Sequence, residues 1–539
     1  MDTRVSPRPK QHILIFLFFT VLAAAVYFLA LDAPLYLDDY YWITYKEESN
    51  NIASAFLNIP TFRGITVFSF AVGKALHGPD PAGYRAVNIL IHAGAAFLCY
   101  MILMRFTKGK TIPAVLGSLV FLLHPLQTQA VTYIVQRMAS LSALFTLLAL
   151  YAHIKARCYW TSGPLPDSKG VPWLILAIGA GFFAVLSKEN AALLPAFVAL
   201  CEWYMSRNDQ ISAKLMRNRI LLRSLPYLLP GIFITIIIYF TPYMMFAPVK
   251  SVPDFVVGYS DSGGYAIYEN APENLRLRYL FTQFKVFWIY IRRLFIPTGQ
   301  MLDYAYPLSA GPTDVTAIIG LIALLSLTAL AWVYRHRVAG LTFGLFWILA
   351  ALSLESSIFP LDSIFEHRMY LPMFGVAAMI SWAADQPFAF RRGKTTLAVS
   401  VSVLALLAAL TMTRNSYWSS PLLFWDDNLH KVPHSRRAWD YRSRAYLMAG
   451  PCLKADEVQS SLSKRDPSYM GLILLERCAY AEGRIQDAYY WFRQIDTTGV
   501  VSNDIYTVEG KNALANKNYD EAVRWFKKAV IKESRDIEA

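Results

Sequence analysis

Two adjacent aspartates, Asp38 and Asp39, lie in the stretch LYLDDYYWITYK (35–46), directly after a long apolar run. Neighbouring carboxylates repel each other, so the charge of one raises the pKa of the other, and the aromatic neighbours lower the local dielectric constant. A carboxylate in that state is suited to act as a general base on a hydroxyl group. Two other interpretations stay open: the pair binds a divalent cation together with a phosphate, or it only stops a helix in water.

Basic residues in apolar surroundings are the second group of candidates. Arg137 lies in YIVQRMASLSALF, and Glu366-His367-Arg368 directly precede an apolar run. Arginine offers paired hydrogen bonds to phosphate oxygens, and a guanidinium deep in an apolar segment normally faces a polar cavity or an anion. If a helix begins at Gln129, Arg137 lies about 12 Å along it. A phosphate site is therefore predicted, and its candidate cations are Arg137, Arg368, Arg292, Arg293, His367 and Lys188.

Other polar residues lie in short connections between apolar runs, and we expect them to support the same site. They are His124, Gln129, Glu189, Glu366 and Asp303. Simpler interpretations exist for some of them: His124-Pro125 is also typical of a helix end, and Lys188-Glu189 could be an ion pair between two helix ends. Their convergence on one side of a membrane would indicate a pocket.

The elements that position these residues are membrane helices. The chain has 539 residues, 55% of them hydrophobic and only 17% charged, with a mean hydropathy of +0.34. Soluble domains average roughly 45–50% apolar and about 25% charged residues, and apolar runs of about 20 residues match the thickness of a bilayer. Eleven spans are predicted, near residues 12–31, 84–105, 111–124, 129–154, 172–187, 190–206, 222–243, 312–334, 341–354, 369–386 and 395–413.

The net charge of +13 is spread over alternate short connections, such as 104–110, 207–223 and 334–337. This distribution is typical of cytoplasmic loops and differs from the single basic face of a nucleic-acid-binding protein. It places the candidate residues on the non-cytoplasmic side. The segment 276–296 is apolar but carries five Lys or Arg residues, so we expect an interfacial or re-entrant helix there rather than a span.

After residue 413 the sequence changes to a repeat. GRIQDAYYWFRQI (483–495) aligns with KNYDEAVRWFKKA (517–529) at a spacing of 34 residues, with Ala, Trp and Phe in register. A 34-residue period with alanine packed beneath aromatic residues is typical of tetratricopeptide (TPR) repeats. The alternative is a pair of ordinary amphipathic hairpins. Cys452 and Cys478 would be exported and could form a disulfide, although spacing alone does not establish that they are close together.

Five segments occur in a fixed order along the chain: LDDYYWI, FLLHPLQTQAVTYIVQRMASLSALF, LSKENAALLPAFVALCEW, GQMLDYAYP and SSIFPLDSIFEHRMYLP. Together they resemble the transmembrane-and-tetratricopeptide protein O-mannosyltransferases and their bacterial homologues, of the GT-C glycosyltransferase superfamily. The resemblance covers nearly the whole chain. It implies a polyprenyl-phosphate-linked sugar donor and an active site on the non-cytoplasmic side.

The resemblance also implies roles for individual residues. It assigns catalysis to Asp38 and Asp39. Two further family motifs map onto His124, Pro125, Thr128, Gln129 and Arg137, and onto Glu366, His367, Arg368 and Tyr370. The chain departs from the family at Gln129, where relatives often carry an acid, and after Arg137, where many carry Ala-Asp. These departures affect the expected donor contacts and leave the acidic pair unchanged.

The expected architecture is all-α: a polytopic GT-C-type membrane domain (1–413) followed by a short TPR domain on the non-cytoplasmic side (414–539). The expected function is transfer of a sugar from a polyprenyl-phosphate donor to Ser or Thr hydroxyls of exported proteins, with Asp38 or Asp39 as the general base. No cofactor is expected beyond an optional divalent cation. The short repeat region favours a bacterial inner-membrane protein whose active site and repeats face the periplasm, the repeats contacting the acceptor protein.

Two alternatives remain. The first is a GT-C enzyme that glycosylates a lipid or a polysaccharide, or that modifies pilin with a preassembled glycan. The second is a membrane scaffold without enzymatic activity that presents its repeats to a partner. The scaffold leaves the outer acids and Arg137 unexplained.

Overall fold

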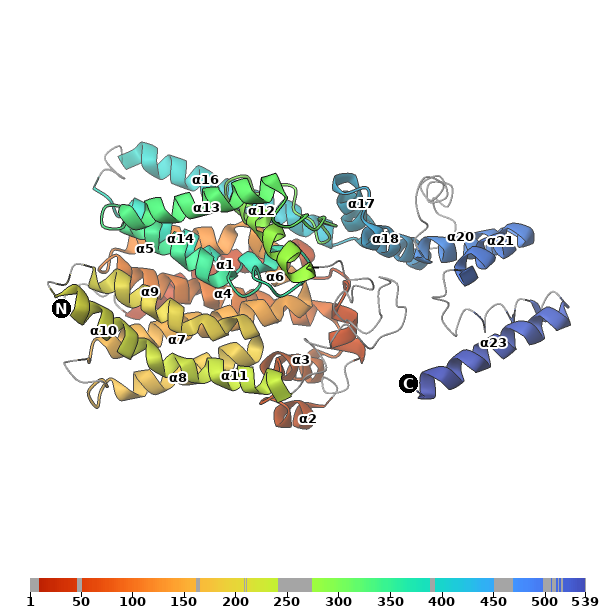
Figure 1. The fold of residues 1–539 in the computed structure, drawn as a ribbon, viewed down its shortest axis with the longest axis horizontal. Helices are drawn as coiled ribbons and strands as arrows, with labels where there is room; N and C mark the ends of the chain where they lie inside the picture. Colours follow the sequence, from red (N-terminus) through yellow and green to blue (C-terminus); the bar gives the residue numbers. More distant parts are fainter. Residues whose placement is uncertain are drawn as a thin grey trace. The chain divides into compact units, whose positions relative to one another are not determined.

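The computed structural model describes residues 9–45, 51–160, 165–207, 209, 211–240, 274–387, 393–449, 469–497, 506, 510, 511, 513, 514 and 517–538. These residues form helices and turns and contain no strand. The protein is therefore all-α in its described part, as the sequence predicts (Figure 1). Contacts divide the chain into two compact units, residues 1–420 and 421–539. Cys452, one half of the disulfide considered from the sequence, lies outside the described residues.

The first unit is a bundle of mostly apolar helices. Its helices are α1 (Pro9–Tyr27), α2 (Ile52–Leu57), α3 (Gly64–His77), α4 (Pro81–Phe106), α5 (Thr111–Leu123), α6 (Thr128–Thr132), α7 (Arg137–Arg157), α8 (Val171–Ser187), α9 (Leu194–Ser206), α10 (Ala213–Ser224), α11 (Leu228–Phe240), α12 (Leu275–Phe295), α13 (Val315–Val333), α14 (Ala339–Leu352), α15 (Met373–Ala384) and α16 (Gly393–Trp418).

Several of these helices can cross a membrane. In the described residues six are long and apolar enough, and a seventh is obtained if α5 and the bent segment Pro125–Thr132 form one span. Three further apolar helices, α8, α14 and α15, are shorter. The protein is therefore a polytopic integral membrane protein, while the number of eleven spans stays a prediction.

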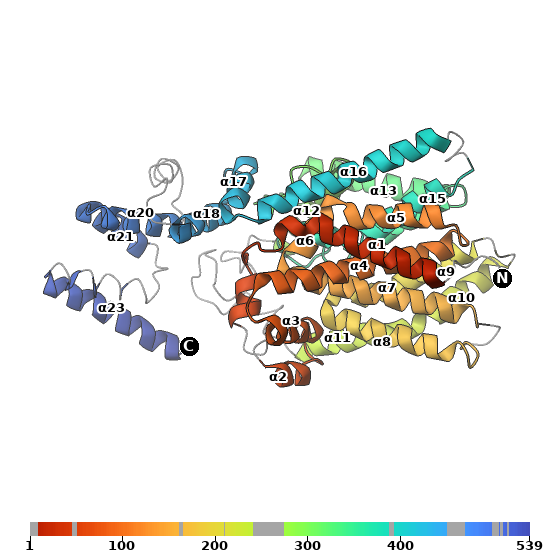
Figure 2. The same cartoon turned by 180° about the vertical axis from the view of Figure 1, so that it is seen from behind.

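Helices α4 and α7 form the centre of the bundle. The span that contains α7 is 78% buried and α4 is 61% buried, whereas α13 and α16 are each only 11% buried. α4 packs against α1, α5 and α7, and α15 packs against α5 and α14. Seen from behind, α1 and α4 run side by side (Figure 2). The peripheral helices thus present apolar surface suited to lipid, and the central ones position polar groups.

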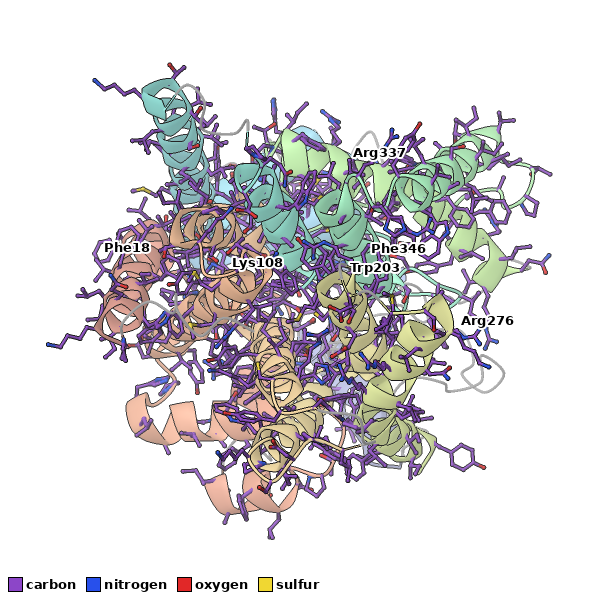
Figure 3. All side chains as sticks on the ribbon, turned by 90° about the vertical axis from the view of Figure 1, so that its left-hand side faces the viewer. Phe18, Lys108, Trp203, Arg276, Arg337 and Phe346 are labelled. Carbon is purple, nitrogen blue, oxygen red and sulfur yellow. The ribbon has the colours of Figure 1, made fainter. Side chains whose placement is uncertain are left out.

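Basic connections gather at one end of this unit. Figure 3 looks onto the end that carries Lys108 and Arg337. There Lys110 pairs with Asp385 at 2.6 Å, which joins the α4–α5 connection to the end of α15. Helices α2 and α3 lie toward the opposite end of the unit from the N-terminus (Figures 1 and 2).

The predicted helix at 129–154 is wrong in its continuity. The chain forms the short α6, then a 3-10 turn at Ile134–Gln136, and only then α7, which begins at Arg137. Arg137 is therefore not 12 Å along a helix, and its burial has another cause. The segment 276–296 corresponds to α12, one continuous 21-residue helix that packs against α13. Its interfacial or re-entrant placement in the membrane stays a prediction.

The second unit consists of helices paired in sequence. They are α17 (Pro421–Lys431), α18 (Arg436–Ala449), α20 (Tyr469–Ala481), α21 (Ile485–Thr497) and α23 (Tyr519–Glu538). α17 packs on α18, α18 on α20 and α20 on α21. α21 begins at residue 485 and α23 at residue 519, a spacing of 34, and Ala488, Phe492, Ala522 and Trp525 are buried. The helices follow the repeat period, while the TPR assignment stays a prediction.

Glycines allow close helix packing inside the membrane unit. A Cβ atom on Gly375 of α15 would lie 2.7 Å from the carbonyl oxygen of Gly344 in α14, and one on Gly344 would lie 2.5 Å from the carbonyl oxygen of Gly375. The two backbones are therefore in direct contact. Small residues at such positions are typical of helix pairs in membranes, where van der Waals packing drives association.

We expect the substitution Gly375→Ala to separate α14 from α15 and to lower stability by about 1–3 kcal/mol, the usual cost of overpacking. Gly179→Ala in α8 is the matched control, because a Cβ there meets no atom within 4 Å. It should be neutral or stabilising by up to about 1 kcal/mol, since alanine favours helix. Apparent Tm values of the two variants in detergent test this, and equal values would contradict the packing argument.

Candidate functional site

The two aspartates have different environments. The carboxylate of Asp39 is fully buried and accepts two backbone hydrogen bonds, from the N–H of Tyr36 at 3.1 Å and of Val135 at 2.7 Å. Asp38 is only half-buried, and its backbone N–H donates to the hydroxyl of Tyr133 at 3.0 Å. Asp39 therefore fastens the loop to the turn before α7, while Asp38 has the more accessible carboxylate.

The backbone immediately before the pair is strained. Leu37 has a φ of +40°, a left-handed conformation that costs a residue with a side chain roughly 1–2 kcal/mol. The hydroxyl of Tyr36 donates to the carbonyl of Trp418 at 2.6 Å, and their rings meet edge to face. Strained residues of this kind are over-represented at functional sites, and here the strain fixes the direction in which the two acids leave the backbone.

Arg85 of α4 binds backbone carbonyls of this loop through its guanidinium. Its guanidinium is 1% exposed and donates to the carbonyls of Thr132 at 3.0 Å, Pro34 at 2.5 Å, Leu31 at 3.3 Å and also Ala33. The charge is thus satisfied by carbonyl oxygens of two segments that are far apart in sequence. Sequence reasoning missed Arg85, although Arg85, Asn88 and His92 are spaced i, i+3 and i+7, which marks one polar face on an apolar helix.

Burial raises the pKa of Asp39 to about 7, against the opposing effects of Arg85 and of the two backbone N–H donors. The neighbouring charge of Asp38 adds to the rise. The sequence predicted this mutual effect of the two acids, but the larger cause, burial, comes from the fold. Asp39 is consequently close to half protonated near neutral pH.

Arg137, the first choice for a phosphate ligand, is fully enclosed by protein. Its Nε donates to Asn88 Oδ1 at 2.7 Å, Nη1 to the carbonyl of Ser69 at 3.0 Å and Nη2 to the carbonyl of Tyr84 at 2.8 Å. Its exposure is 0%. The guanidinium therefore joins α3, α4 and α7, and its three nitrogens donate to protein acceptors rather than to a phosphate.

The motif Glu366-His367-Arg368 forms the second half of the candidate site. Oε1 of Glu366 accepts the N–H of Met301 at 3.0 Å and the hydroxyl of Tyr304 at 2.6 Å. The N–H and Nδ1 of His367 both bond Oε1 of Gln129, at 2.7 and 3.1 Å. Three of the five ordered sequence motifs therefore meet here.

His367 is a neutral residue in this setting. Burial lowers the pKa of His367 well below its usual range, and the nearby charges of Lys188 and Arg368 lower it further. Nδ1 carries a proton to donate to Gln129, so His367 supplies no positive charge to a phosphate. Burial has the opposite effect on Glu366, whose pKa is raised.

The cations around His367 already have partners. Lys188 pairs with Glu355 at 2.5 Å, and Arg63 pairs with Glu189 at 2.9 Å. Arg368 donates to the carbonyl of Asp362 at 2.7 Å. The alternative that Lys188 and Glu189 pair with each other is wrong, because each binds a residue from a different part of the chain.

Arg293 differs from these cations. It is 9% exposed, and its buried Nε has no hydrogen-bond partner among the residues that the structure describes. Burial raises the pKa of both Glu366 and Tyr304, and the charge of Arg293 opposes that rise in each. The charge of Arg414 opposes it in Glu366 as well. Arg292 is exposed on the same helix. Arg414 was missed from the sequence because the last span was ended at 413, whereas α16 continues to Trp418.

The remaining predicted residues position backbone and helices. Nδ1 of His124 accepts the N–H of Leu126 at 3.2 Å and Nε2 lies 3.2 Å from the carbonyl of Leu294. The hydroxyl of Tyr370 lies 2.8 Å from Nδ1 of His92. Asp303 is 8% exposed and accepts the N–H of Ala305 at 3.3 Å. Two of the three, His124 and Tyr370, link helices distant in sequence.

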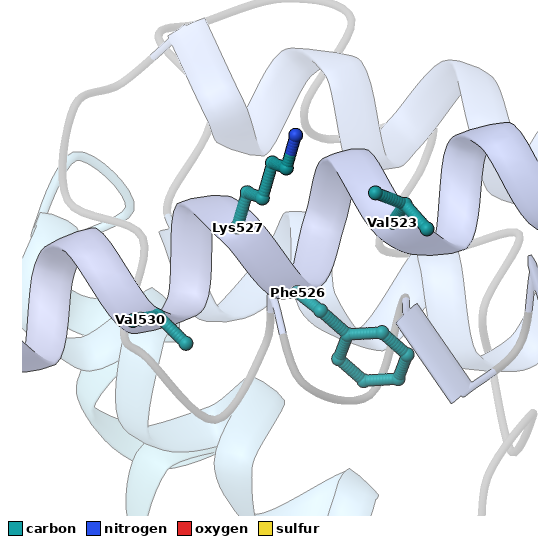
Figure 4. A pocket seen from close by; sticks show the side chains of 4 residues that line it. All are labelled: Val523, Phe526, Lys527 and Val530. Atoms are coloured by element: carbon teal, nitrogen blue, oxygen red, sulfur yellow. The ribbon is translucent and has the colours of Figure 1, made fainter.

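No group of three or more His, Cys, Asp or Glu side chains able to hold a metal ion occurs among the described residues. A cation bound by the Asp38–Asp39 pair would need oxygen ligands from a phosphate. A hollow of about 390 Å³ lies elsewhere, on α23, lined by Val523, Phe526, Lys527 and Val530 (Figure 4). Its single charged group is Lys527, and no acidic residue lines it.

Comparison with known proteins gives consistent relatives. The chain is 21% identical over 426 residues to protein O-mannosyl-transferase F38B6.6 of Caenorhabditis elegans, covering 76% of this chain and 54% of that protein. It is 23% identical over 470 residues to protein O-mannosyl-transferase Tmtc3 of Drosophila melanogaster, covering 74% and 46%. The chain is 31% identical over 143 residues to human protein O-mannosyl-transferase TMTC4, a match that covers 24% of this chain and 19% of that protein.

The chain is a relative of the TMTC-type protein O-mannosyltransferases. The resemblance drawn from the ordered motifs is thereby confirmed. This TMTC relative spans about half the length, or less, of the curated proteins it matches. No family model matches it. An oligosaccharyltransferase of Archaeoglobus fulgidus aligns with a TM-score of 0.37 and 9% identity over 86% of this chain and 60% of that one, a similarity too low to bear on the fold.

We expect Arg137→Lys to destabilise the TMTC relative, because a lysine cannot reach Asn88, Ser69 and Tyr84 together. Each hydrogen bond lost from a charged group costs about 1.5–3 kcal/mol. Arg337→Lys, on the exposed connection between α13 and α14, is the control. The apparent Tm in detergent should fall for Arg137→Lys only. A variant with unchanged Tm would contradict the structural role.

Asp39 should make stability depend on pH. Its native pKa of about 7 exceeds the unfolded value of about 3.9, so the folded state binds the extra proton between these values. The stability contributed is complete below pH 4 and is lost as the pH rises toward 7, a change on the order of 4 kcal/mol. Melting curves from pH 4 to 8 should show this loss in the wild type and not in Asp39→Asn. Parallel pH profiles of the two proteins would contradict the assignment.

Proposed function

We propose that this chain is a glycosyltransferase that moves a sugar from a polyprenyl-phosphate-linked donor to Ser or Thr hydroxyls of exported proteins, on the non-cytoplasmic side of the membrane. The relatives support the class, since they are named as protein O-mannosyl-transferases. The chemistry is argued from the two halves of the candidate site.

The observation that carries the proposal is the contrast between the two aspartates. A general base must come within hydrogen-bond reach of the acceptor hydroxyl, so its side chain must be accessible to the acceptor. Both oxygens of Asp39 already accept backbone N–H groups and the side chain is fully buried. Asp38 is half-buried on the same rigid loop. Asp38 is therefore the better base, and Asp39 is the residue that positions it.

The reaction follows as an inverting displacement. The acceptor oxygen attacks the anomeric carbon of the donor sugar while Asp38 takes the hydroxyl proton. The bond between the anomeric carbon and the phosphate oxygen breaks, and the polyprenyl phosphate leaves with the electron pair. A phosphate already stabilises its negative charge, so a protein acid is less needed at the leaving group, and nearby cations offset the charge that develops.

The raised pKa of Asp39 fits this division of roles. A second full negative charge beside Asp38 would raise the pKa of Asp38 and hold more of it protonated. With Asp39 close to half protonated near neutral pH, that effect is weakened. Asp39 thus fixes the loop through its hydrogen bonds and raises the pKa of Asp38 less than a fully ionised carboxylate would.

The setting of the reaction is a proposal as well. The basic connections at the end of the bundle opposite the acid loop suit the cytoplasmic face, which assigns the acid loop to the periplasm of a bacterial inner membrane. The helical second unit, with its 34-residue spacing, would contact the acceptor protein, since repeat arrays of this kind offer extended binding surfaces.

We expect Asp38→Asn to lower transfer by about 10²–10⁴-fold, the usual contribution of a general base, and the apparent Tm in detergent shows whether the variant remains folded. Asp32→Asn, on an exposed residue that precedes the same loop, is the control. Intact-mass spectrometry of exported proteins from cells complemented with each variant measures the added hexoses.

Full transfer by Asp38→Asn, by Asp39→Asn and by the double variant would overturn the assignment of the acid loop. If protein hexose additions persist in a deletion strain while a glycolipid or polysaccharide loses its sugar, the acceptor class is wrong. If the second unit tethered by one helix restores function, the chain is a scaffold rather than an enzyme.

A further inference from the structure

Arg293 is a buried cation that the interactions of the described chain leave unsatisfied. It lies in the last turn of α12 and is 9% exposed. Its Nε is buried without a hydrogen-bond partner, and no hydrogen bond or ion pair of its guanidinium occurs among the described residues. An unpaired buried charge is costly, so this position is expected to be stabilised by an anion from outside the chain.

The chain makes room for this guanidinium at Gly299. Gly299 has a φ of +70°, and a Cβ atom there would lie 2.6 Å from Nη1 of Arg293. Two separate constraints, a left-handed backbone and a close contact, therefore require glycine at this position. The same short segment supplies the Met301 N–H and the Tyr304 hydroxyl that hold Glu366.

A second buried cation acts electrostatically on Glu366. Arg414 of α16 is 6% exposed and acts on Glu366 and on Tyr36 of the acid loop. Its charge therefore acts on residues of both halves of the candidate site. A further buried donor, Nε2 of Gln129, also has no partner within the described part of the chain, and Oε1 of Gln129 accepts the N–H of His367.

The surroundings of Arg293 fit an anion that carries an apolar tail. Phe295 and Ile296, two and three residues further along the chain, are 81% and 53% exposed. A cation beside an exposed apolar surface on a membrane helix bundle suits a phosphate head group whose apolar chain lies in lipid. Free phosphate has no apolar part to contact that surface.

We propose that Gly299 seats Arg293, and that Arg293 together with Arg414 binds the phosphate of a lipid phosphate. This inference rests on the proposed function and selects two cations from a larger set. Arg137, Arg368 and Lys188 are bound to protein acceptors, so Arg293 is left to give the donor phosphate its hydrogen bonds. Gly299 acts as a positioning residue, because it contributes space rather than a contact.

Binding of farnesyl phosphate to the purified full-length chain in detergent tests this. Arg293→Gln and Arg414→Gln should weaken binding by about 10–100-fold, the effect of losing one hydrogen bond to a charged group. Gly299→Ala keeps every charge and should weaken binding at least about tenfold by displacing the guanidinium. Farnesol should bind weakly, with the same affinity in all variants.

Two controls match these variants. Gly311→Ala imposes the same kind of backbone strain, since Gly311 has a φ of +87°, but the Cβ atom added there would lie 3.7 Å from its nearest neighbour, Arg278 Cγ. Arg276→Gln removes an exposed charge from the same helix, on the outer flank of the bundle (Figure 3). Both should bind farnesyl phosphate like the wild type.

Equal affinities for Gly299→Ala and Gly311→Ala, or wild-type affinity for Arg293→Gln, would overturn the proposal. Inorganic phosphate that binds as tightly as farnesyl phosphate would overturn the lipid assignment. The outcome is separable from sugar transfer. If farnesyl phosphate binding depends on Arg293 but no sugar is transferred, the proposed function alone is refuted. If sugar is transferred but binding is unaffected by the Arg293 and Gly299 variants, only the proposed phosphate site is refuted.

Discussion

The guanidinium of Arg85 joins the loop that carries the two aspartates to the segment that precedes α7. It binds carbonyl oxygens at residues 31–34 and at Thr132, and Asp39 completes the link through the N–H of Val135. A charge inside an apolar bundle is tolerated only when such acceptors surround it. The burial of Arg85 therefore dictates the shape of the loop, and the loop shape decides which aspartate is accessible.

The same constraint organises the rest of the polar interior. Arg137 is enclosed by acceptors from α3 and α4, Lys188 by Glu355 and Arg63 by Glu189. These pairs join segments far apart in sequence and resist rearrangement, because removing one partner leaves a buried charge uncompensated. Against this background the lack of a partner for Arg293 among the described residues is informative. Most buried cations near the site have a structural role, and the exception points to a ligand.

The sequence predicted the all-α membrane architecture, because hydrophobic length and charge in short connections depend on local composition alone. It also identified the acid pair and the motifs at Gln129, Glu366 and His367, which the structure brings together. It failed on the helix at 129–154, since a helical apolar pattern does not reveal a break whose carbonyls are satisfied by Arg85 and Asn88. It missed Arg414 because α16 remains helical beyond its apolar run.

By itself, then, the sequence determined that this is a polytopic helical membrane protein with an acidic pair, several deep cations and a 34-residue period. These follow from residue types and their spacing. Only the tertiary structure decided that the buried Arg293 has no hydrogen-bond partner for its Nε among the described residues, that Lys188 binds Glu355 rather than Glu189, and that Asp39 is buried while Asp38 is more exposed. The physical reason is that hydrogen bonding and burial depend on neighbours contributed by distant segments, and residue types alone do not specify those neighbours.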